Sequence, residues 1–293
     1  MMLFGIEAGG TKFILGAGSA PNHILERVRI PTEHPSVTIP AVIEAMQGLA
    51  DRHVRPDAIG IASFGPVEIR IDHQQWGHLL ATPKQEWVGV NLVGPIADVY
   101  AVPLALDTDV NGAALAEGAY GAGKDVSNLV YLTFGTGVGG GLVVGGGTIR
   151  GAGHPEMGHI RVPRHPDDDF PGVCPYHGDC LEGMASGPAI ETRWGKPANE
   201  LDSKLEPVLE LEAHYIAHAL ANIVYVVAPE RFVLGGGVSN LPGFHRAISE
   251  RLAELLSGYP GIPHHAAESF VVAPGLGEDA GLTGALMLAA SVR

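Results

Sequence analysis

Short runs of apolar residues alternate with a longer helical pattern in the first part of the chain. The expected strands of this part span residues 3–7, 11–17, 25–30 and 58–62. The first two runs are joined by Ala8-Gly9-Gly10, a glycine turn that suits a β-hairpin. Residues 38–52 carry apolar side chains at helical spacing, which predicts a helix before the fourth strand. This alternation is typical of an α/β protein.

The order of strand, glycine turn and strand occurs a second time. The apolar run 129–134 leads into the glycine-rich run 135–141 and then into the apolar residues 142–144. Such a repeat indicates two halves that each begin with a hairpin. We therefore expect a small lobe over residues 1–112 and a large lobe over residues 113–279.

Three further elements are expected toward the C-terminus. Apolar residues within 209–227 line one face of a long helix, which Pro229 ends. Residues 231–234 form a strand that runs into Gly235-Gly236-Gly237. A last helix over 281–290 is expected to pack back on the small lobe, so that residues from about 280 to 293 belong to that lobe.

Charge and composition narrow the functional classes. The chain has 18 Lys and Arg against 32 Asp and Glu and no basic cluster, which argues against a nucleic-acid partner. Its most apolar segment, 219–228, is far shorter than the roughly 20 residues that cross a bilayer, and residues 1–10 lack the pattern of a signal peptide. We expect a cytoplasmic protein without a membrane partner.

The 41 glycines are unusually many for a chain of this length, and the turns that contain them are candidate phosphate sites. Backbone NH groups of a glycine-rich turn converge on an anion without obstruction by side chains. Candidate polar side chains beside the turns are Thr11, Lys12, Thr133 and Thr136. The alternative is that the glycines only form tight hairpins. Glycines outside the turns at Gly9, Gly135 and Gly235 are expected in ordinary turns.

A dinucleotide site of the Rossmann type is disfavoured. The letters Gly135-x-Gly137-x-x-Gly140 fit its fingerprint, but that motif requires the third glycine to open a helix. Here the third glycine leads into another apolar run, which predicts a strand.

The segment Asp107-Thr108-Asp109-Val110-Asn111 joins a short strand over 103–106 to an alanine-rich helix over 112–120. One interpretation is that Asp109 caps this helix, a role that Asp often fills. The other is that Asp109 faces a ligand, where a carboxylate orients a hydroxyl and accepts its proton. The local sequence alone leaves both open.

Both cysteines of the chain lie in an irregular segment over 151–187. Cys174-x-x-His177-x-x-Cys180 supplies three ligands, and a nearby histidine would complete a tetrahedral zinc site. The candidates for the fourth ligand are His154, His159 and His165. The alternatives are a loop with free thiols and exposed histidines, or a single disulfide that would add little to a chain of this size.

These motifs together resemble the ROK family of sugar kinases, and most of all its fructokinase branch, over nearly the whole chain. The resemblance implies a two-lobed actin-like ATPase (ribonuclease H-like) α/β fold with a zinc-stabilised loop insertion. It also implies that the first two turns bind the phosphates of ATP and that the third lies against the adenosine. The implied ATP-binding residues are Gly9, Gly10, Thr11, Lys12, Thr133, Gly135, Thr136, Gly137, Gly235, Gly236 and Gly237.

The resemblance also assigns the residues of the chemistry. Asp109 would be the general base that accepts the proton of the sugar hydroxyl. The implied sugar-binding residues are Gly65, Pro66, Thr108, Asp109, Glu156 and His159. Thr108 departs from the Asn of the family motif Asn-Asp-x-Asn, and Glu7 stands where most of the superfold has the Asp that holds Mg²⁺ through water.

The zinc set implied by the resemblance is His159, Cys174, His177 and Cys180, because Glu156-Met157-Gly158-His159 matches the family motif Glu-x-Gly-His. The implied activity is transfer of the ATP γ-phosphate to the 6-hydroxyl of D-fructose. The alternatives are a glucokinase or mannokinase of the same family and a sugar-sensing regulator. We also expect a homodimer.

Overall fold

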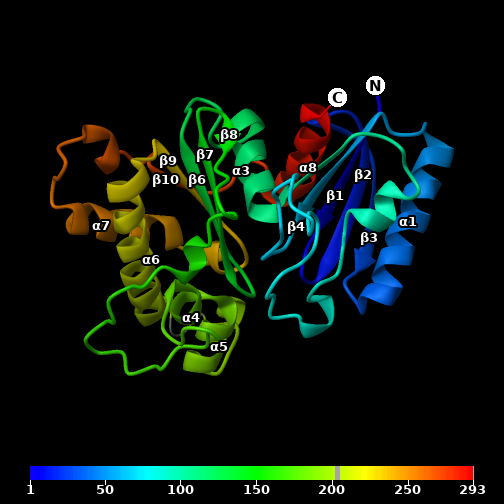
Figure 1. Cartoon of the computed structure of the whole chain (residues 1–293). Helices are drawn as coiled ribbons and strands as arrows, with labels where there is room; N and C mark the ends of the chain where they lie inside the picture. Colours follow the sequence, from blue (N-terminus) through cyan, green and yellow to red (C-terminus); the bar gives the residue numbers. More distant parts are fainter. Residues whose placement is uncertain (202–204, 293) are drawn as a thin grey trace. The chain divides into compact units, whose positions relative to one another are not determined.

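The computed structural model describes residues 1–201 and 205–292 of the chain (Figure 1). The strands are β1 (Leu3–Ala8), β2 (Lys12–Ala20), β3 (His23–Pro31), β4 (Ala58–Ser63), β5 (Leu104–Thr108), β6 (Leu129–Phe134), β7 (Val138–Val144), β8 (Gly147–Thr148), β9 (Arg231–Gly235) and β10 (Val271–Val272). The helices are α1 (Pro35–Arg52), α2 (Gly94–Ala97), α3 (Asp109–Tyr120), α4 (Leu181–Ala185), α5 (Gly187–Trp194), α6 (Leu205–Val227), α7 (Phe244–Leu256) and α8 (Ala280–Ser291). Both predicted glycine-turned hairpins are present, as the antiparallel pairs β1–β2 and β6–β7. Among the described residues, no helix has the length and apolar character that crossing a membrane requires.

The first compact unit contains residues 1–121, residues 146–155 and the chain from residue 276 onward. Its sheet has the strand order β3-β2-β1-β4-β5, in which β1, β4 and β5 are mutually parallel neighbours. Successive side chains of a strand point to opposite faces of the sheet. Phe4 and Ile6 accordingly pack with α1, whereas Leu3 packs with α8. Helix α8, red in Figure 1, therefore covers one face of the sheet that contains the blue strands β1, β2 and β3.

Glycines allow α8 to lie very close to its neighbours. A Cβ on Gly60 in β4 would stand 1.9 Å from the carbonyl oxygen of Ala285, and a Cβ on Gly284 would stand 2.2 Å from that of Gly112. No side chain fits at these distances, so the helix can approach the strand and α3 only because glycine is present. The expectation that the glycines outside the turns at Gly9, Gly135 and Gly235 serve ordinary turns was therefore wrong for these positions.

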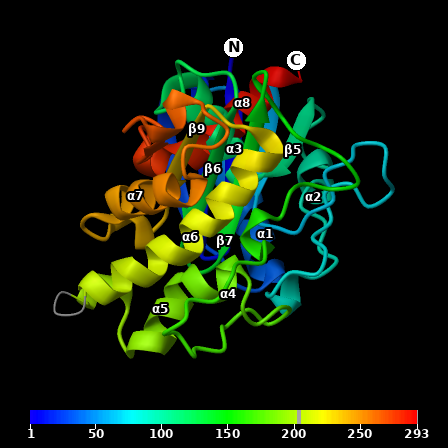
Figure 2. The ribbon, with the colours of Figure 1, turned by 90° about the vertical axis from the view of Figure 1, so that its left-hand side faces the viewer.

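The second compact unit contains residues 122–145 and 156–275. Its strands lie in one sheet in the order β10-β9-β6-β7. The long helix α6 begins at Leu205, ends at Val227 and packs on α7, as the yellow and orange helices of Figure 2 show. Their buried faces share one apolar core with β6 and β9, which includes Phe134, Phe232 and Phe244.

A buried polar network joins the segment before the cysteines to α5 and α6. Asp168 accepts hydrogen bonds from the Tyr215 hydroxyl (2.6 Å) and from Nη2 of Arg193 (3.1 Å). Glu212 on α6 is 1% exposed, its two oxygens have no hydrogen-bond partner, and the closest Arg193 nitrogen lies 4.0 Å away. Burial raises the pKa of Glu212 to about 8, since Arg193 offsets the loss of solvation only in part and Asp168 adds a like charge.

Candidate functional site

Three of the predicted site segments lie along one edge of the first sheet. Because β1, β4 and β5 run parallel, their carboxyl ends meet at the same edge. Gly9 follows β1, Gly65 and Pro66 follow β4, and Asp109 follows β5. The NH of Phe64 donates to the carbonyl of Ala8 over 2.7 Å, which ties the second of these segments to the first. The topology therefore brings the glycine turn, the predicted sugar-side residues and the predicted base of this unit together.

The first glycine turn is a tight connection that Thr32 holds through two hydrogen bonds. The NH of Gly9 donates to the carbonyl of Lys12 (3.0 Å), which closes the turn. The Thr32 hydroxyl donates to the carbonyl of Gly9 (2.7 Å), and its NH donates to the carbonyl of Thr11 (3.0 Å). Thr11 is exposed and Gly10 half-buried, so the turn presents its outer surface to solvent while its carbonyls are engaged on the inside.

Glu7 lies at the end of β1 against the first turn of α8. A Cβ on Gly281 would stand 2.3 Å from the carboxyl carbon of Glu7, so glycine is needed there for the carboxylate to fit. Burial raises the pKa of Glu7 to about 7, against the lowering influence of Lys12 and Arg29. Its buried Oε2 has no hydrogen-bond partner. A single carboxylate with a free oxygen fits Mg²⁺, which proteins hold through one or two carboxylates together with substrate phosphates.

Asp109 is the first residue of α3, not its cap. The N-cap is Thr108, whose hydroxyl oxygen accepts the hydrogen bond of the Asn111 NH at 3.1 Å. The interpretation that Asp109 caps the helix was therefore wrong. Asp109 is half-buried, and its Oδ1 accepts a bond from the NH of Val110 at 2.8 Å. Thr108 is buried, and its hydroxyl caps α3. A contact between Thr108 and the sugar stays a prediction.

Asp107 supports this loop, a role that the sequence did not indicate. Its side chain is fully buried, and Oδ1 accepts bonds from the NH of Thr108 (2.8 Å) and from Nδ2 of Asn111 (2.6 Å). Oδ2 accepts bonds from the hydroxyl of Thr148 (2.8 Å) and from Nη2 of Arg150 (2.9 Å). One carboxylate therefore holds the residues around Asp109 and fastens residues 146–155 to the end of β5.

In the second unit, two glycine turns lie at neighbouring strand ends. β6 and β9 are parallel, and Thr133 lies opposite Gly235 in the register. Gly236 has a φ of +89°, and a Cβ there would stand 2.4 Å from the carbonyl oxygen of Phe134, so this position requires glycine. Gly135 and Gly237 have open space where a Cβ would stand, and Thr136 is exposed. Both turns thus have open space beside their backbone at these glycines.

The glycine turn over residues 135–137 leads into a strand, and a neighbouring helix starts against it. Gly140 lies within β7, so the helix that a Rossmann fingerprint requires is absent from this position. Helix α5 begins at Gly187, whose NH donates to the carbonyl of Gly135 (2.8 Å), and Ser186 caps it. Glu182 holds the turn from another side, because its Oε2 accepts a bond from the NH of Val138 (3.0 Å).

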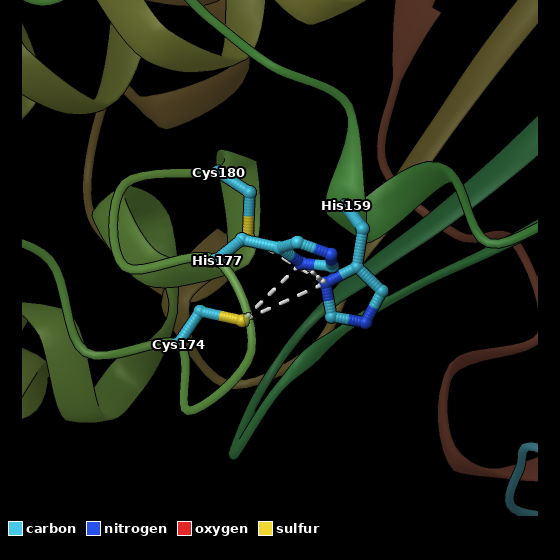
Figure 3. A group of neighbouring side chains, drawn as sticks. All are labelled: His159, Cys174, His177 and Cys180. Atoms are coloured by element: carbon cyan, nitrogen blue, oxygen red, sulfur yellow. Dashed lines mark hydrogen bonds between the residues drawn. The ribbon is translucent and has the colours of Figure 1, made fainter. Parts of the chain in front are cut away.

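His159, Cys174, His177 and Cys180 converge, as the family resemblance implied (Figure 3). The two histidine Nδ1 atoms lie 3.3 Å apart, and Sγ–Nδ1 distances are 3.7 Å from Cys174 to His159 and 3.5 Å from Cys180 to His159. Zinc bonds of about 2.0–2.1 Å to nitrogen and about 2.3 Å to sulfur, at tetrahedral angles, place ligand atoms about 3.3 Å (N–N) and about 3.6 Å (N–S) apart. The four side chains therefore fit a tetrahedral zinc ion.

The thiols and the other histidines agree with this assignment. Both cysteines are free and buried, so the disulfide alternative was wrong. Burial and, to a smaller extent, the adjacent Cys174 thiol together raise the pKa of the Cys180 thiol to about 11. His154 instead accepts a hydrogen bond from the NH of Val67 (3.2 Å), and His165 lies 3.8 Å from Glu210. His159 is thus the histidine that completes the cluster.

The cluster is connected to the glycine turn over residues 135–137 through adjacent residues. Cys180 precedes α4, which carries Glu182 and thereby the bond to the NH of Val138. On the other side, a Cβ on Gly158, next to His159, would stand 1.8 Å from the carbonyl oxygen of Val138. Glu156, which is exposed, accepts the NH of His159 through its carbonyl (3.0 Å). Sugar binding by Glu156 and His159 stays a prediction.

Comparisons with known proteins agree with this arrangement. The model of the ROK family matches residues 3–292. A fructokinase of Zymomonas mobilis is 42% identical over 287 residues, which cover 97% of this chain and 95% of that protein. Three further relatives named fructokinase are 36–40% identical and cover 88–99% of this chain.

Solved structures agree as well. The ROK hexokinase of Thermus thermophilus superposes with a TM-score of 0.81 at 29% identity, covering 99% of this chain and 98% of that one. The ROK glucokinase of Streptomyces griseus, determined with glucose and AMPPNP, gives a TM-score of 0.78 at 26% identity and covers 99% of this chain and all of that one. The predicted fold class is confirmed. This chain belongs to the ROK family and is a carbohydrate kinase.

Proposed function

We propose that this enzyme is an ATP-dependent fructokinase, which transfers the γ-phosphate of ATP to the 6-hydroxyl of D-fructose. The observation that carries the proposal is the sheet edge where the glycine turn after β1, Gly65 and Pro66 after β4 and Asp109 after β5 meet. The choice of D-fructose as the sugar rests on the relatives. The Zymomonas mobilis protein, which is 42% identical to this chain, is named a fructokinase, whereas the Streptomyces griseus glucokinase is 26% identical.

Asp109 is proposed to act as the general base. It would orient the 6-hydroxyl and accept its proton while the oxygen bonds to the γ-phosphorus and the bond from that phosphorus to the bridging oxygen of ADP breaks. The products are fructose 6-phosphate, ADP and the proton left on Asp109. The hydrogen bonds that Asp107 accepts from the NH of Thr108 and from Nδ2 of Asn111 would keep the carboxylate of Asp109 in place.

The backbone turns are proposed to bind ATP. Gly9, Gly10, Thr11 and Lys12 would bind phosphate oxygens, and the same role is proposed for Thr133, Gly135, Thr136 and Gly137. Gly235, Gly236 and Gly237 would lie against the adenosine. Mg²⁺, held by Glu7, would neutralise part of the phosphate charge. Zn²⁺ on His159, Cys174, His177 and Cys180 would be structural, fixing the segment that carries Glu156 and Glu182.

The remaining predictions belong to this proposal. Gly65, Pro66, Thr108, Glu156 and His159 would contact the sugar. We further expect the enzyme to act in the cytoplasm and as a homodimer.

A coupled ADP-release assay tests the proposal. Wild-type protein with Mg²⁺ and ATP is supplied in turn with D-fructose, D-glucose and D-mannose. We expect the highest kcat/KM with D-fructose, and a kcat at least about 100-fold lower for Asp109→Asn, since a general base contributes roughly 10²–10⁴-fold. The matched control is Asp51→Asn, an exposed carboxylate on α1. Preference for glucose or mannose would favour the other hexose kinases, and no turnover with any sugar would favour a regulator.

A further inference from the structure

A second lysine lies beside the first glycine turn. The Cε atom of Lys84 is 3.5 Å from the position that a Cβ on Gly10 would take. Lys84 belongs to the segment that precedes the short helical turn over Gln85–Trp87, far along the chain from the hairpin of β1 and β2. The turn thus has one ammonium group from its own sequence, that of Lys12, and a second from a separate segment.

Lysine is scarce in this protein, which makes the pairing informative. The chain has five lysines, at positions 12, 84, 124, 196 and 204, against 32 carboxylate side chains. Two of the five therefore lie at one turn. Among the described residues, neither Lys12 nor Lys84 has a carboxylate oxygen within ion-pair distance, whereas most ion pairs of the chain use arginine. Both ammonium groups remain available to an anionic ligand.

The backbone of Lys84 is held by the last residue of the helical turn, Trp87. The NH of Trp87 donates to the carbonyl of Lys84 (2.9 Å), and the Trp87 ring is fully buried. That ring stacks on Phe13, with centroids 5.7 Å apart, and meets the edge of Phe64 at 5.6 Å. Phe13 directly follows Lys12, and Phe64 directly precedes Gly65. The indole therefore sets Lys84 relative to the glycine turn and to the segment after β4.

We propose that Lys84 is a second phosphate-binding cation of the first glycine turn, which binds the triphosphate of ATP together with Lys12. This inference rests on the proposed function, which supplies the ligand. Lysine binds phosphate as a mobile point charge, and a glycine turn supplies NH donors beside it. An ammonium group that has no carboxylate partner in the free protein can contact the triphosphate without first breaking an ion pair.

Three variants and three probes test the inference by calorimetry without sugar. Lys84→Met removes the charge at nearly the same length, Lys84→Arg keeps the charge, and Lys196→Met is the matched control at an exposed lysine. The probes are AMPPNP with Mg²⁺, adenosine and inorganic tripolyphosphate. Loss of a charge-assisted hydrogen bond is expected to raise the Kd of Lys84→Met for AMPPNP and tripolyphosphate by roughly 10- to 100-fold. Adenosine binding and the Tm should not change, and Lys84→Arg should recover most of the affinity.

Other outcomes would overturn the inference. Wild-type affinity of Lys84→Met for both phosphate probes would show that the ammonium group does not contact phosphate. An equal loss of adenosine affinity, or a lowered Tm shared by Lys84→Met and Lys84→Arg, would show a structural role instead. If the wild-type protein phosphorylates no sugar, the proposed function fails, but the tripolyphosphate comparison still decides the role of Lys84.

Discussion

Replacement of Glu212 by Gln should change how the stability of the protein depends on pH. Glu212 is buried on α6 without a hydrogen-bond partner for either oxygen. Arg193 lies closer to Asp168 (3.1 Å) than to Glu212 (4.0 Å), so its charge mainly compensates Asp168. Burial therefore keeps Glu212 protonated in the folded protein and raises its pKa from 4.5 to about 8.

The sign and size of the effect follow from proton binding. Between pH 4.5 and about 8 the folded state holds a proton on Glu212 that the unfolded state has released. The free energy of unfolding therefore falls as the pH rises through this window, by about 1.4 kcal/mol per pH unit. Between pH 5 and pH 7.5, ionisation of Glu212 alone should lower the free energy of unfolding by about 3 kcal/mol. Glutamine has a similar shape and stays neutral, so the free energy of unfolding of Glu212→Gln should not fall in this way as the pH rises.

Denaturant unfolding with saturating zinc, from pH 5 to pH 8, measures the difference. Glu212→Gln should match the wild type within about 1 kcal/mol at pH 5 and exceed it by about 3 kcal/mol at pH 7.5. Glu206→Gln, an exposed position on the same helix, is the control and should follow the wild type throughout. Parallel pH profiles for Glu212→Gln and the wild type would refute the reasoning, because they would show that Glu212 is ionised in the folded protein.

Three further predictions concern supports of the fold and site. Asp107→Asn should lower the free energy of unfolding by at least about 2 kcal/mol, since an amide cannot accept all four hydrogen bonds; unchanged denaturant midpoints would contradict this role. Gly60→Ala should lower the free energy of unfolding by about 1–3 kcal/mol or more, because the added methyl group would meet the backbone of Ala285. An unchanged Tm would show that α8 can move away from β4 without loss of stability. Metal analysis should find about one zinc per chain, lost in Cys174→Ser together with part of the thermal stability; a metal-free wild type of full stability would disprove the zinc assignment.

The features that could be predicted from the sequence are those set by neighbouring residues. The two hairpins follow from apolar runs on either side of a glycine turn, and three members of the His/Cys cluster follow from the spacing Cys174-x-x-His177-x-x-Cys180. The fourth ligand required the family resemblance, because three histidines lie near the cysteines in the chain. The structure distinguishes these three candidates, because of His154, His159 and His165 it is His159 that lies in the cluster.

The features that were missed depend on contacts between distant segments. Asp107 binds Thr148, which lies 41 positions along the chain, and Glu182 binds the NH of Val138 across 44 positions. Nothing in the local pattern of either carboxylate indicates these partners. Likewise, a glycine within the apolar run of β4 gives no sign that α8 will lie against it. The cap of α3 was misplaced because β5 extends to Thr108, two residues beyond the predicted end of the strand.

The central claim is tested most directly by letting two sugars compete for the enzyme. Equal concentrations of D-fructose and D-glucose are incubated with the wild-type protein, Mg²⁺ and ATP, and the phosphorylated products are identified by ³¹P NMR. The account predicts that fructose 6-phosphate forms first and dominates while both sugars remain. Predominant glucose 6-phosphate, or ADP formed without any sugar phosphate, would contradict it.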